Sequence, residues 1–384
     1  MTEHPLKPPV TVTHIISGDL WAGAEVQVYN LCKALNRSEE VAVTAVVFNR
    51  GILHDRLVDL GIPVGLADEN EVGPLGIARN IAAHCRLQET DIVHTHGFKE
   101  NVLGIFGKEL AGVRYSVRTV HGNPEHQLSW RKPHKWLIHR LDIWLGRTRQ
   151  QAVIAVSSQL EKVLGPIFPG RVRKIFNFID VQELRSIWLP KPDKQLKQIR
   201  LGIVGRLVPV KRIDIFLKTI QLLAEEGINC KGIVLGDGPL RDNLKELART
   251  LGVEQRIEFR GFVNPAAKEM VTLDALLMTS DHEGLPMVLL EALALEIPCI
   301  GHRTGGIPEI FNGGKCGYLV NTQNETDYAQ AVKILLKDKQ NLNQARLGIE
   351  HIESNFSIQS NAPLYSDIYS CISGLPEKTD QGAL

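Results

Sequence analysis

The sequence lacks the features that mark several large classes of protein. Its six cysteines are scattered, with no pair at metal-ligand spacing and no dense disulfide framework. It contains no run of about 18 uncharged apolar residues, and its first 17 residues show no basic stretch followed by a long apolar one. We therefore expect a cytoplasmic protein that is neither secreted nor membrane-spanning.

Neither sign of charge dominates the chain. Lys and Arg total 44, Asp and Glu total 43, and the net charge is +1, which excludes a nucleic-acid binder with a dominant basic field. The 43% hydrophobic and 23% charged content is typical of a soluble, enzyme-like chain. Because 384 residues exceed one ordinary core, we expect two domains of about 150 to 200 residues each.

Short β-branched runs alternate with longer helical patterns, as in parallel sheets with crossover helices. In the first half these runs are Val10–Ile16, Val41–Phe48, Asp91–His94, Val117–Val120 and Ala152–Val156. In the second half they are Leu201–Val204, Lys231–Leu235, Arg256–Phe259, Ala275–Thr279 and Pro298–Gly301. The pattern predicts an α/β fold of two Rossmann-like, doubly wound domains facing a central, ligand-binding cleft.

A polar stretch rich in Pro and Lys interrupts this rhythm near Leu189. We predict an N-terminal domain over residues 1–185, a linker over 186–198 and a C-terminal domain over 199–355. Residues 356–384 are expected to contain a helix that crosses back to the first domain, followed by a frayed tail.

The segment Glu283-Gly284-Leu285-Pro286-Met287-Val288 leads from a strand end into an apolar helix that carries Glu291. Pro286 suits the first helical position, and the free N–H groups there favour an anion. A continuous helix would separate the two carboxylates by roughly 12 Å, at about 1.5 Å per residue. Carboxylates at both ends would accept hydrogen bonds from vicinal hydroxyls. The alternative is a helix with a capping Glu and a surface Glu.

Two cations follow the first strand of the second half. Arg206 and Lys211 lie on a strand-to-helix connection, where they would neutralise a diphosphate leaving group, unless they are ordinary solvated cations. The next strand ends in Gly236-Asp237-Gly238, whose glycines permit a tight turn and close backbone approach to a ligand. In the first half, Gly23 opens a helix and leaves room for a diphosphate or an acceptor.

Glu283 and Glu291 with Gly284-Leu285-Pro286 between them, together with Gly205-Arg206 and Lys211, resemble the signature of glycosyltransferase family 4. The resemblance implies a retaining enzyme of the two-domain GT-B fold, in which residues 1–185 form the acceptor-side domain and residues 199–355 the sugar-nucleotide-binding domain. It implies that Glu283 holds hydroxyls of the donor sugar, that backbone amides from Gly284 to Val288 meet sugar and phosphate, and that Glu291 holds the ribose.

The resemblance also assigns residues outside that signature. The main chain at Phe262 and Val263 would contact the nucleobase, and His121, in Thr119-Val120-His121-Gly122, would lie near the anomeric carbon as a catalytic residue. A structural His121 is the alternative. Family members often have two glycines where this chain has Gly23-Ala24, so Ala24 is a mild departure from the family pattern.

We expect no metal and no cofactor. Asp281-His282-Glu283 is the nearest approach to a metal-binding Asp-x-Asp pair, but Arg206 and Lys211 supply the positive charge that a metal would bring. His94 and His96 suggest zinc, yet no third ligand is spaced nearby in the sequence.

The hypothesis is transfer of a hexosyl or N-acetylhexosaminyl unit from a nucleoside-diphosphate sugar, by family habit a UDP-sugar, to a hydroxyl of a glycan or lipid-linked acceptor. The alternatives are a sugar-nucleotide 2-epimerase of the same fold and a catalytically silent carbohydrate-binding scaffold.

The segment 130–149 mixes Trp with many cations. It suggests peripheral contact with an anionic membrane at its cytoplasmic face, with polysaccharide biosynthesis as the setting. The alternative is a domain helix whose Trp side chains pack in the core.

Overall fold

The computed structural model describes residues 9–122, 133–186, 198–337 and 341–374, without the side chains of 133–137 and 341–343. Its contacts divide the chain into two compact units. Unit 1 comprises Met1–Asn177 with Ile358–Leu384, and unit 2 comprises Phe178–Ser357. Within the described ranges, no helix combines the length and the apolar character needed to cross a membrane.

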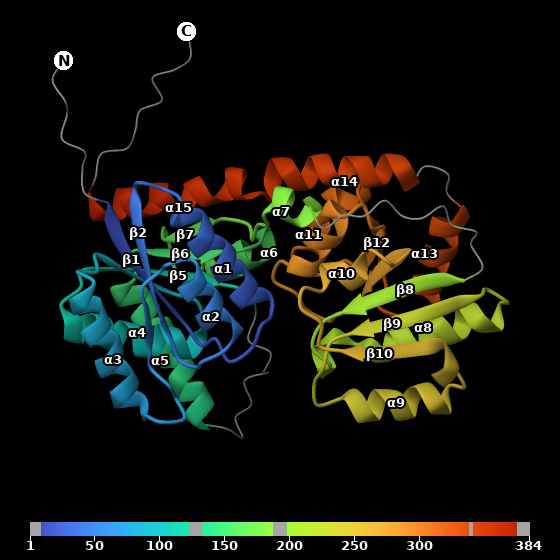
Figure 1. Cartoon of the computed structure of the whole chain (residues 1–384), viewed down its shortest axis with the longest axis horizontal. Coiled ribbons are helices and arrows are strands. Elements are labelled where there is room, and N and C mark those ends of the chain that lie inside the picture. Colours follow the sequence, from blue (N-terminus) through green and yellow to red (C-terminus); the bar gives the residue numbers. More distant parts are fainter. Residues whose placement is uncertain (1–8, 123–132, 187–197, 338–340, 375–384) are drawn as a thin grey trace, which may run out of the picture. The chain divides into compact units, whose positions relative to one another are not determined.

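Unit 1 alternates strands and helices along the chain. Its strands are β1 (Val10–Ile16), β2 (Val41–Val47), β3 (Val64–Leu66), β4 (Ile92–Thr95), β5 (Tyr115–Val120), β6 (Ala152–Ala155) and β7 (Val172–Lys174). Its helices are α1 (Gly23–Leu35), α2 (Ile52–Asp59), α3 (Pro74–Leu87), α4 (Phe98–Ala111), α5 (Pro133–Arg149), α6 (Ser158–Leu164) and α15 (Ile358–Ser373). Although α15 follows unit 2 in sequence, it packs against α1 and β1 (Figure 1).

The sheet of unit 1 is seven-stranded and parallel, in the order β3-β2-β1-β4-β5-β6-β7. The strand order reverses between β1 and β4, which makes their carboxyl ends the topological switch point. One core cluster joins Ile15 and Val93 of these strands to Ile77 and Ile81 of α3. Burying each such side chain stabilises the fold by about 1.5–3 kcal/mol.

Unit 2 repeats the same architecture with a smaller sheet. Its strands are β8 (Ile199–Val204), β9 (Cys230–Leu235), β10 (Ile257–Gly261), β11 (Ala275–Met278), β12 (Cys299–His302) and β13 (Tyr318–Val320). Its α-helices are α7 (Val181–Ser186), α8 (Ile213–Glu225), α9 (Arg241–Thr250), α10 (Ala267–Met270), α11 (Met287–Ala294), α12 (Ile307–Ile310), α13 (Glu325–Lys337) and α14 (Asn341–Asn355). Three short 3₁₀ turns are η1 (Pro209–Lys211), η2 (Glu254–Arg256) and η3 (Asn312–Gly314).

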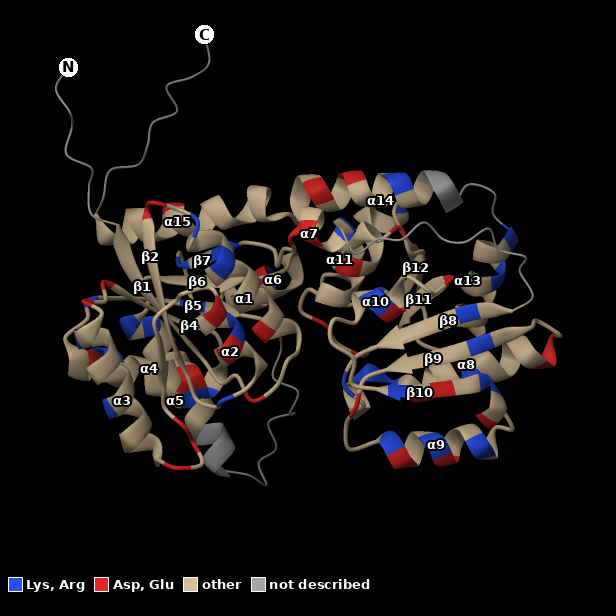
Figure 2. Cartoon of the chain, viewed as in Figure 1, with Lys and Arg blue, Asp and Glu red and all other residues tan. Residues whose placement is uncertain are grey.

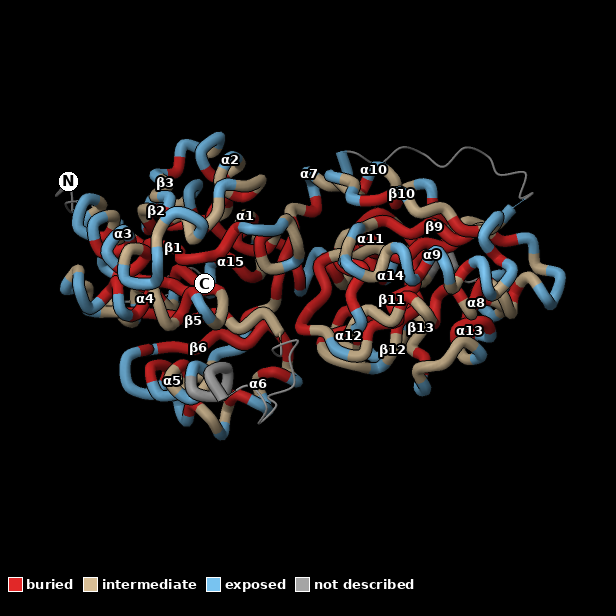
Figure 3. Tube along the Cα trace, turned by 90° about the horizontal axis from the view of Figure 1, so that it is seen from below, coloured by how far each residue is buried: buried red, intermediate tan, exposed pale blue. Residues whose placement is uncertain are grey.

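The sheet of unit 2 is six-stranded and parallel, in the order β10-β9-β8-β11-β12-β13. Its switch point lies between β8 and β11. In Figure 3 the central strands of each unit are buried and exposed residues concentrate on the surrounding helices and loops. Figure 2 shows that α9 carries both signs of charge along its length, so it offers no uniformly basic face.

The structure differs from the sequence-based expectation at the sheet edges and at the domain boundaries. Strands β3, β7 and β13 were not predicted, so β5 is the fifth strand of unit 1 and not the fourth. Phe178–Ser186, expected at the end of the first domain and start of the linker, groups with unit 2 because α7 packs on α11 and Arg185 pairs with Glu296. Linker residues 187–197 lie outside the described ranges. Phe356 and Ser357, expected in the returning helix, still belong to unit 2.

Candidate functional site

The switch point of unit 2 brings together two residues that the sequence singles out separately. Lys211 ends the η1 turn after β8, and Glu283 lies in the loop after β11. The Lys211 ammonium donates to Oε1 of Glu283 at 2.7 Å. The side chains are 23% and 9% exposed, so this ion pair is largely removed from water.

Backbone contacts hold these two loops against each other. The amide of Asp281 donates to the carbonyl of Val210 at 2.8 Å, and the Thr279 hydroxyl donates to the carbonyl of Lys211 at 2.8 Å. Arg212 adds a second ionic link, since its guanidinium contacts Asp214 and, at 3.2 Å, Asp281. Asp214 makes the larger contribution and Asp281 a smaller one, and together they raise the pKa of Arg212 above its usual value. Sequence reasoning missed this link because Arg212 and Asp281 are 69 residues apart.

Arg206 differs from Lys211 in its surroundings. Its side chain is exposed, and it makes no ion pair or hydrogen bond with any other residue that the structure describes. All of its guanidinium donors are therefore open to a ligand. A small pocket at the switch point is lined by Gly205, Lys211 and Ser280, together with apolar residues that include members of β8, β9 and β11.

Glycine lets the loops after β8 and β9 approach backbone to backbone. A Cβ at Gly236 would lie 1.9 Å from the carbonyl oxygen of Gly205, and one at Gly238 would lie 2.7 Å from the backbone of Leu207. Gly236 and Gly238 were predicted to let the backbone come close to a ligand. In the structure they come close to the loop after β8, and this contact fixes the backbone beside Arg206.

The loop after β12 packs on the loop that holds Glu283. Gly306 donates its amide to the carbonyl of Gly284 at 2.7 Å, and the Thr304 hydroxyl donates to the carbonyl of Asp281 at 3.0 Å. At Gly305, where φ is +56°, a Cβ would lie 2.0 Å from the carbonyl oxygen of Glu283. Only glycine fits there, so this loop supports the position of Glu283.

The helix after Glu283 begins one residue later than predicted. Pro286 is the N-cap with ψ of 115°, so the first helical residue is Met287 and not Pro286. The prediction that the two carboxylates are roughly 12 Å apart is therefore wrong, because it assumed a continuous helix between them. The helical rise applies only from Met287. No side chain caps the helix, and its first turn contains no acidic residue. No carboxylate of the first turn therefore competes with a ligand for the free amides at the helix start.

Glu291 lies in the second turn of α11 and is half-buried. Burial raises the pKa of its carboxyl to about 7. It therefore holds a proton more readily than an exposed glutamate, and in that form it can both donate to and accept from a ligand hydroxyl. Phe262 and Val263 follow β10, and Phe262 is 54% exposed.

Gly23 and His121 belong to unit 1. Gly23 is the exposed first residue of α1, and the preceding Ala22 amide donates to Oε2 of Glu25 at 3.2 Å. Burial raises the pKa of Glu25 to about 7. His121 follows β5, and burial lowers its pKa to about 4, so its imidazole is neutral at neutral pH.

The expectation that His94 and His96 lack a third partner is wrong. His14, on β1, brings a third imidazole to them, and one nitrogen from each of the three rings lies within 4.8 Å of the others. The sequence hides this partner because His14 precedes His96 by 82 residues. The parallel register of β1 and β4 places His14 directly beside His94.

The basic, Trp-containing segment 130–149 overlaps α5, and residues 123–132 lie outside the described ranges. Within the described part, Trp144 is 54% exposed, so the interpretation that packs it in the core is wrong for this residue. Asp142 on the same helix is buried and pairs with Arg118 at 2.8 Å.

Family models match most of the chain. The model described as "Glycosyltransferase Family 4" matches residues 21–183, and the one described as "Glycosyl transferases group 1" matches residues 185–349. These two matches follow the division into unit 1 and unit 2 closely.

Two relatives resemble the chain over most of their length. The N-acetyl-alpha-D-glucosaminyl L-malate synthase of Bacillus anthracis is 27% identical over 309 residues, 77% of this chain and 78% of the relative. A UDP-Gal:alpha-D-GlcNAc-diphosphoundecaprenol alpha-1,3-galactosyltransferase of Escherichia coli is 25% identical over 296 residues, 73% of this chain and 76% of the relative.

Solved structures share the fold. HepE of Anabaena, in complex with UDP and glucose, superposes with a TM-score of 0.80 at 20% identity and covers 94% of this chain and 100% of its own. Sucrose-phosphate synthase of Thermosynechococcus elongatus gives a TM-score of 0.77 at 16% identity, with 95% and 99% covered. The GT-B fold predicted from the sequence is thereby confirmed. With the family models and the relatives in agreement along both units, the chain belongs to glycosyltransferase family 4.

Proposed function

We propose that this glycosyltransferase is a retaining, metal-independent enzyme. It transfers a hexosyl or N-acetylhexosaminyl unit from a nucleoside-diphosphate sugar, with UDP as the nucleotide, to a hydroxyl of a glycan or lipid-linked acceptor in polysaccharide biosynthesis. The observation that carries the proposal is the Lys211–Glu283 ion pair at the switch point of unit 2, with the exposed Arg206 in the same connection between β8 and α8 as Lys211.

The ion pair allows a carboxylate and a diphosphate to occupy one site. Glu283 alone would repel the phosphates, but Lys211 neutralises it and holds one oxygen at 2.7 Å. The second carboxylate oxygen remains able to accept from sugar hydroxyls. Lys211 uses one of its three N–H donors on Glu283, so two remain for phosphate oxygens.

The same groups would stabilise the leaving group. As the bond between the anomeric carbon and the phosphate oxygen breaks, negative charge grows on the diphosphate, and Arg206, Lys211 and the free amides at the start of α11 can meet it. We propose front-face displacement, in which the departing diphosphate helps to remove the proton from the acceptor hydroxyl. With two cations at the diphosphate, no metal ion is required for charge neutralisation.

The proposed substrates draw support from the relatives. HepE was solved with UDP and glucose, and the Escherichia coli relative is named for a UDP-galactose donor and a diphosphoundecaprenol acceptor. The Bacillus anthracis relative is named for an N-acetylglucosaminyl product on malate, so acceptor chemistry varies among relatives. Glu291 would hold the ribose, and the backbone at Gly236, Gly238, Phe262 and Val263 would surround the nucleotide.

A thermal-shift panel of sugar nucleotides, followed by mass spectrometry of products on candidate acceptors, tests the proposal. The expected result is stabilisation by one UDP-sugar and transfer with retained anomeric configuration, at a rate that EDTA leaves unchanged. Glu283→Ala and the Arg206→Ala/Lys211→Ala pair should each lower transfer at least about 100-fold, the scale of a lost oxyanion donor. Arg249→Ala, an exposed cation on α9, is the matched control.

Each other outcome points elsewhere. Free UDP released without any acceptor, accompanied by an altered sugar, would indicate a 2-epimerase. Tight binding with neither transfer nor hydrolysis would indicate a carbohydrate-binding scaffold. Unchanged donor affinity and rate in the alanine variants would overturn the assignment of the site.

We also propose peripheral contact with an anionic membrane from the cytoplasmic side through α5. Ile138 and Trp144 are exposed on this helix, and Arg140 and Arg147 lie within one helical turn of Trp144. Vesicles containing anionic lipid should retain the protein in flotation, and Trp144→Ala should weaken that retention. Equal recovery with neutral and anionic vesicles would contradict the proposal.

A further inference from the structure

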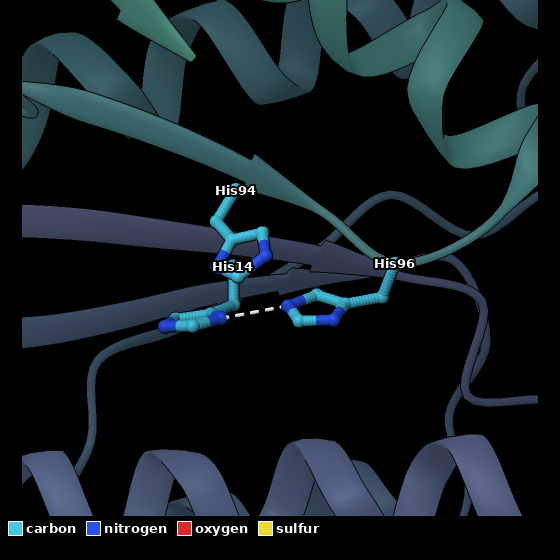
Figure 4. Close-up of side chains that lie close together, drawn as sticks. All are labelled: His14, His94 and His96. Carbon is cyan, nitrogen blue, oxygen red and sulfur yellow. Dashed lines mark hydrogen bonds between the residues drawn. The ribbon is translucent and has the colours of Figure 1, made fainter. Parts of the chain in front are cut away.

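The two switch points gather side chains of different character. In unit 1 they are the buried imidazoles of His14, His94 and His96, which Figure 4 shows close together near the ends of β1 and β4. Burial lowers the pKa of all three, so this group is uncharged at neutral pH. In unit 2 the group at the switch point is ionic, and the member that no sequence pattern predicted is Arg212.

Arg212 has a backbone conformation that arginine rarely adopts. It lies between the η1 turn and α8 with φ of 47° and ψ of 48°, in the left-handed region. A side chain with a Cβ is strained there, whereas glycine is not, and the residue before a helix ordinarily has an extended backbone. Such strain persists where surrounding contacts impose it, so the contacts of the arginine side chain need an explanation.

The guanidinium of Arg212 bridges two segments of unit 2. Nε and Nη2 donate to the two carboxylate oxygens of Asp214 at 3.0 Å each, which ties Arg212 to the first turn of α8. Nη1 donates to Oδ1 of Asp281 at 3.2 Å, which ties it to the loop after β11. A two-point contact of the kind made with Asp214 fixes the direction of a guanidinium as well as its distance. Arg212 therefore links the loop after β11 to the start of α8 in one orientation.

The two linked segments carry the ion pair on which the proposed donor site rests. Arg212 directly follows Lys211, and Asp281 precedes Glu283 by two residues. The amide of Asp281 also donates to the carbonyl of Val210 at 2.8 Å, so a backbone link and a side-chain link act on the same two loops. Nζ of Lys211 and Oε1 of Glu283 are 2.7 Å apart in this arrangement. A shift of either loop would change that distance.

The charges around Arg212 do not favour a role as a phosphate ligand. Three of its five N–H groups are used by Asp214 and Asp281. Two carboxylates against one guanidinium leave the trio with a net negative charge, which repels a diphosphate. Arg206 differs, because it makes no ion pair or hydrogen bond with any residue that the structure describes. Arg206 is therefore open to a ligand, whereas Arg212 is committed to contacts within unit 2.

We propose that Arg212 is a positioning residue for the Lys211–Glu283 ion pair. Its bridge to Asp214 and Asp281 holds the η1 turn and the loop after β11 in place before any ligand binds, which explains an arginine at a position whose backbone favours glycine. Groups that are aligned in advance stabilise a transition state without first being rearranged. Arg212 touches no substrate in this scheme. The identity of the ligand rests on the proposed function, whereas the bridge is a property of unit 2 alone.

Hydrogen–deuterium exchange of the full-length protein tests the bridge without any substrate. Arg212→Gly removes the guanidinium, and Asp281→Asn weakens the same contact from the other loop. Because these side chains are roughly one-third exposed, both variants should speed up exchange about fivefold in peptides that cover residues 208–213 and 279–286. A peptide from β9 should exchange at the parent rate. If neither variant changes exchange in the two segments, the bridge does not hold the loops and the proposal is overturned.

Kinetics test the consequence for transfer. Arg212→Gly and Arg212→Ala both lose the bridge, but only alanine keeps the backbone strain. Both should lower kcat about tenfold while the donor KM changes less than about threefold, because Lys211 acts most on the charge that develops in the transition state. Arg212→Lys keeps a cation between the carboxylates and should recover part of kcat. Glu89→Gly is the matched control, because Glu89 has a φ of 50° but is exposed and lies in unit 1.

The other outcomes separate this proposal from its rivals. If Arg212→Gly keeps the parent kcat and only Arg212→Ala is slow, the position requires a backbone conformation and not a guanidinium. If the donor KM rises about tenfold at unchanged kcat, Arg212 binds the ligand and does not position the ion pair. Arg212→Gly should melt within about 3 °C of the parent, because relief of strain offsets the lost contact. If the parent protein turns over no sugar nucleotide, the proposed function fails, and the exchange measurement still decides whether Arg212 holds the two loops.

Discussion

Replacing Lys211 by Met should destabilise unit 2 because it leaves the Glu283 carboxylate with no cation. Nζ of Lys211 is 2.7 Å from Oε1 of Glu283, and the carboxylate side chain is only 9% exposed. Breaking a fully buried pair costs about 3–5 kcal/mol, whereas an exposed pair contributes about 0–1 kcal/mol. Since the Lys211 side chain is still 23% exposed, we expect a loss of about 2 kcal/mol.

Urea denaturation followed by circular dichroism measures this loss, with Lys211→Met, Glu283→Gln and the double variant in one cycle. The double variant should be more stable than the sum of the single losses predicts, with a coupling energy of about 1–2 kcal/mol. Arg185→Met is the matched control, because the Arg185–Glu296 pair is 39% and 34% exposed. Its loss should stay below about 0.5 kcal/mol.

The same variants separate stability from ligand binding. Lys211→Met should also weaken binding of the sugar nucleotide, because it removes two donors as well as the charge that neutralises Glu283. If Lys211→Met unfolds no more readily than Arg185→Met and the cycle is additive, the ion pair does not stabilise the site. Lys211 would then not be the residue that makes Glu283 compatible with a bound diphosphate.

Three further predictions follow from backbone geometry and burial. Gly305→Ala should lower the free energy of unfolding by about 3 kcal/mol in urea denaturation, because its Cβ would meet the carbonyl of Glu283. The control Gly313→Ala, also at positive φ but in open space, should lower it by about 1 kcal/mol. His14 has a pKa of about 3 in the fold, so as pH falls below about 6.5 this imidazole takes up a proton in the unfolded chain but not in the folded one. The free energy of unfolding should therefore drop by up to about 1.4 kcal/mol per pH unit, and His14→Phe should flatten this slope in thermal denaturation. Glu25, with a folded pKa of about 7, should have the opposite effect, with stability lost as pH rises from about 4.5 to 7 and regained in Glu25→Gln.

The central strands and the edge strand β10 could be predicted from sequence, whereas the edge strands β3, β7 and β13 could not. Each central strand has a run of β-branched and apolar residues, as in Val10–Ile16, because both faces of a parallel sheet are covered. The three missed strands have three residues each and lie at or near the ends of the sheets. Val172–Lys174 contains two cations, so it carries no apolar pattern to recognise.

The members of the candidate donor site could be predicted, but their pairing could not. Lys211 and Glu283 each follow a strand end, which the sequence indicates. Their contact depends on β8 and β11 being neighbours, which follows from the crossover at the switch point. The helix start was misplaced by one residue because Pro286 fits both the N-cap and the first helical position in a sequence pattern.

The group of His14, His94 and His96 shows why spacing along the sequence is a poor guide at a switch point. His14 and His96 are 82 residues apart, and Tyr369 follows His94 by 275 residues, yet the parallel register and α15 bring all four side chains into one network. A histidine judged alone on a strand is ordinarily a core residue. Since carboxyl ends of adjacent parallel strands share one edge, polar residues within two positions of those ends should be considered together, even when separated by a whole βαβ unit. Applied to β1, β4 and β5, that rule groups His14, His94, His96 and His121 by their positions in the sequence.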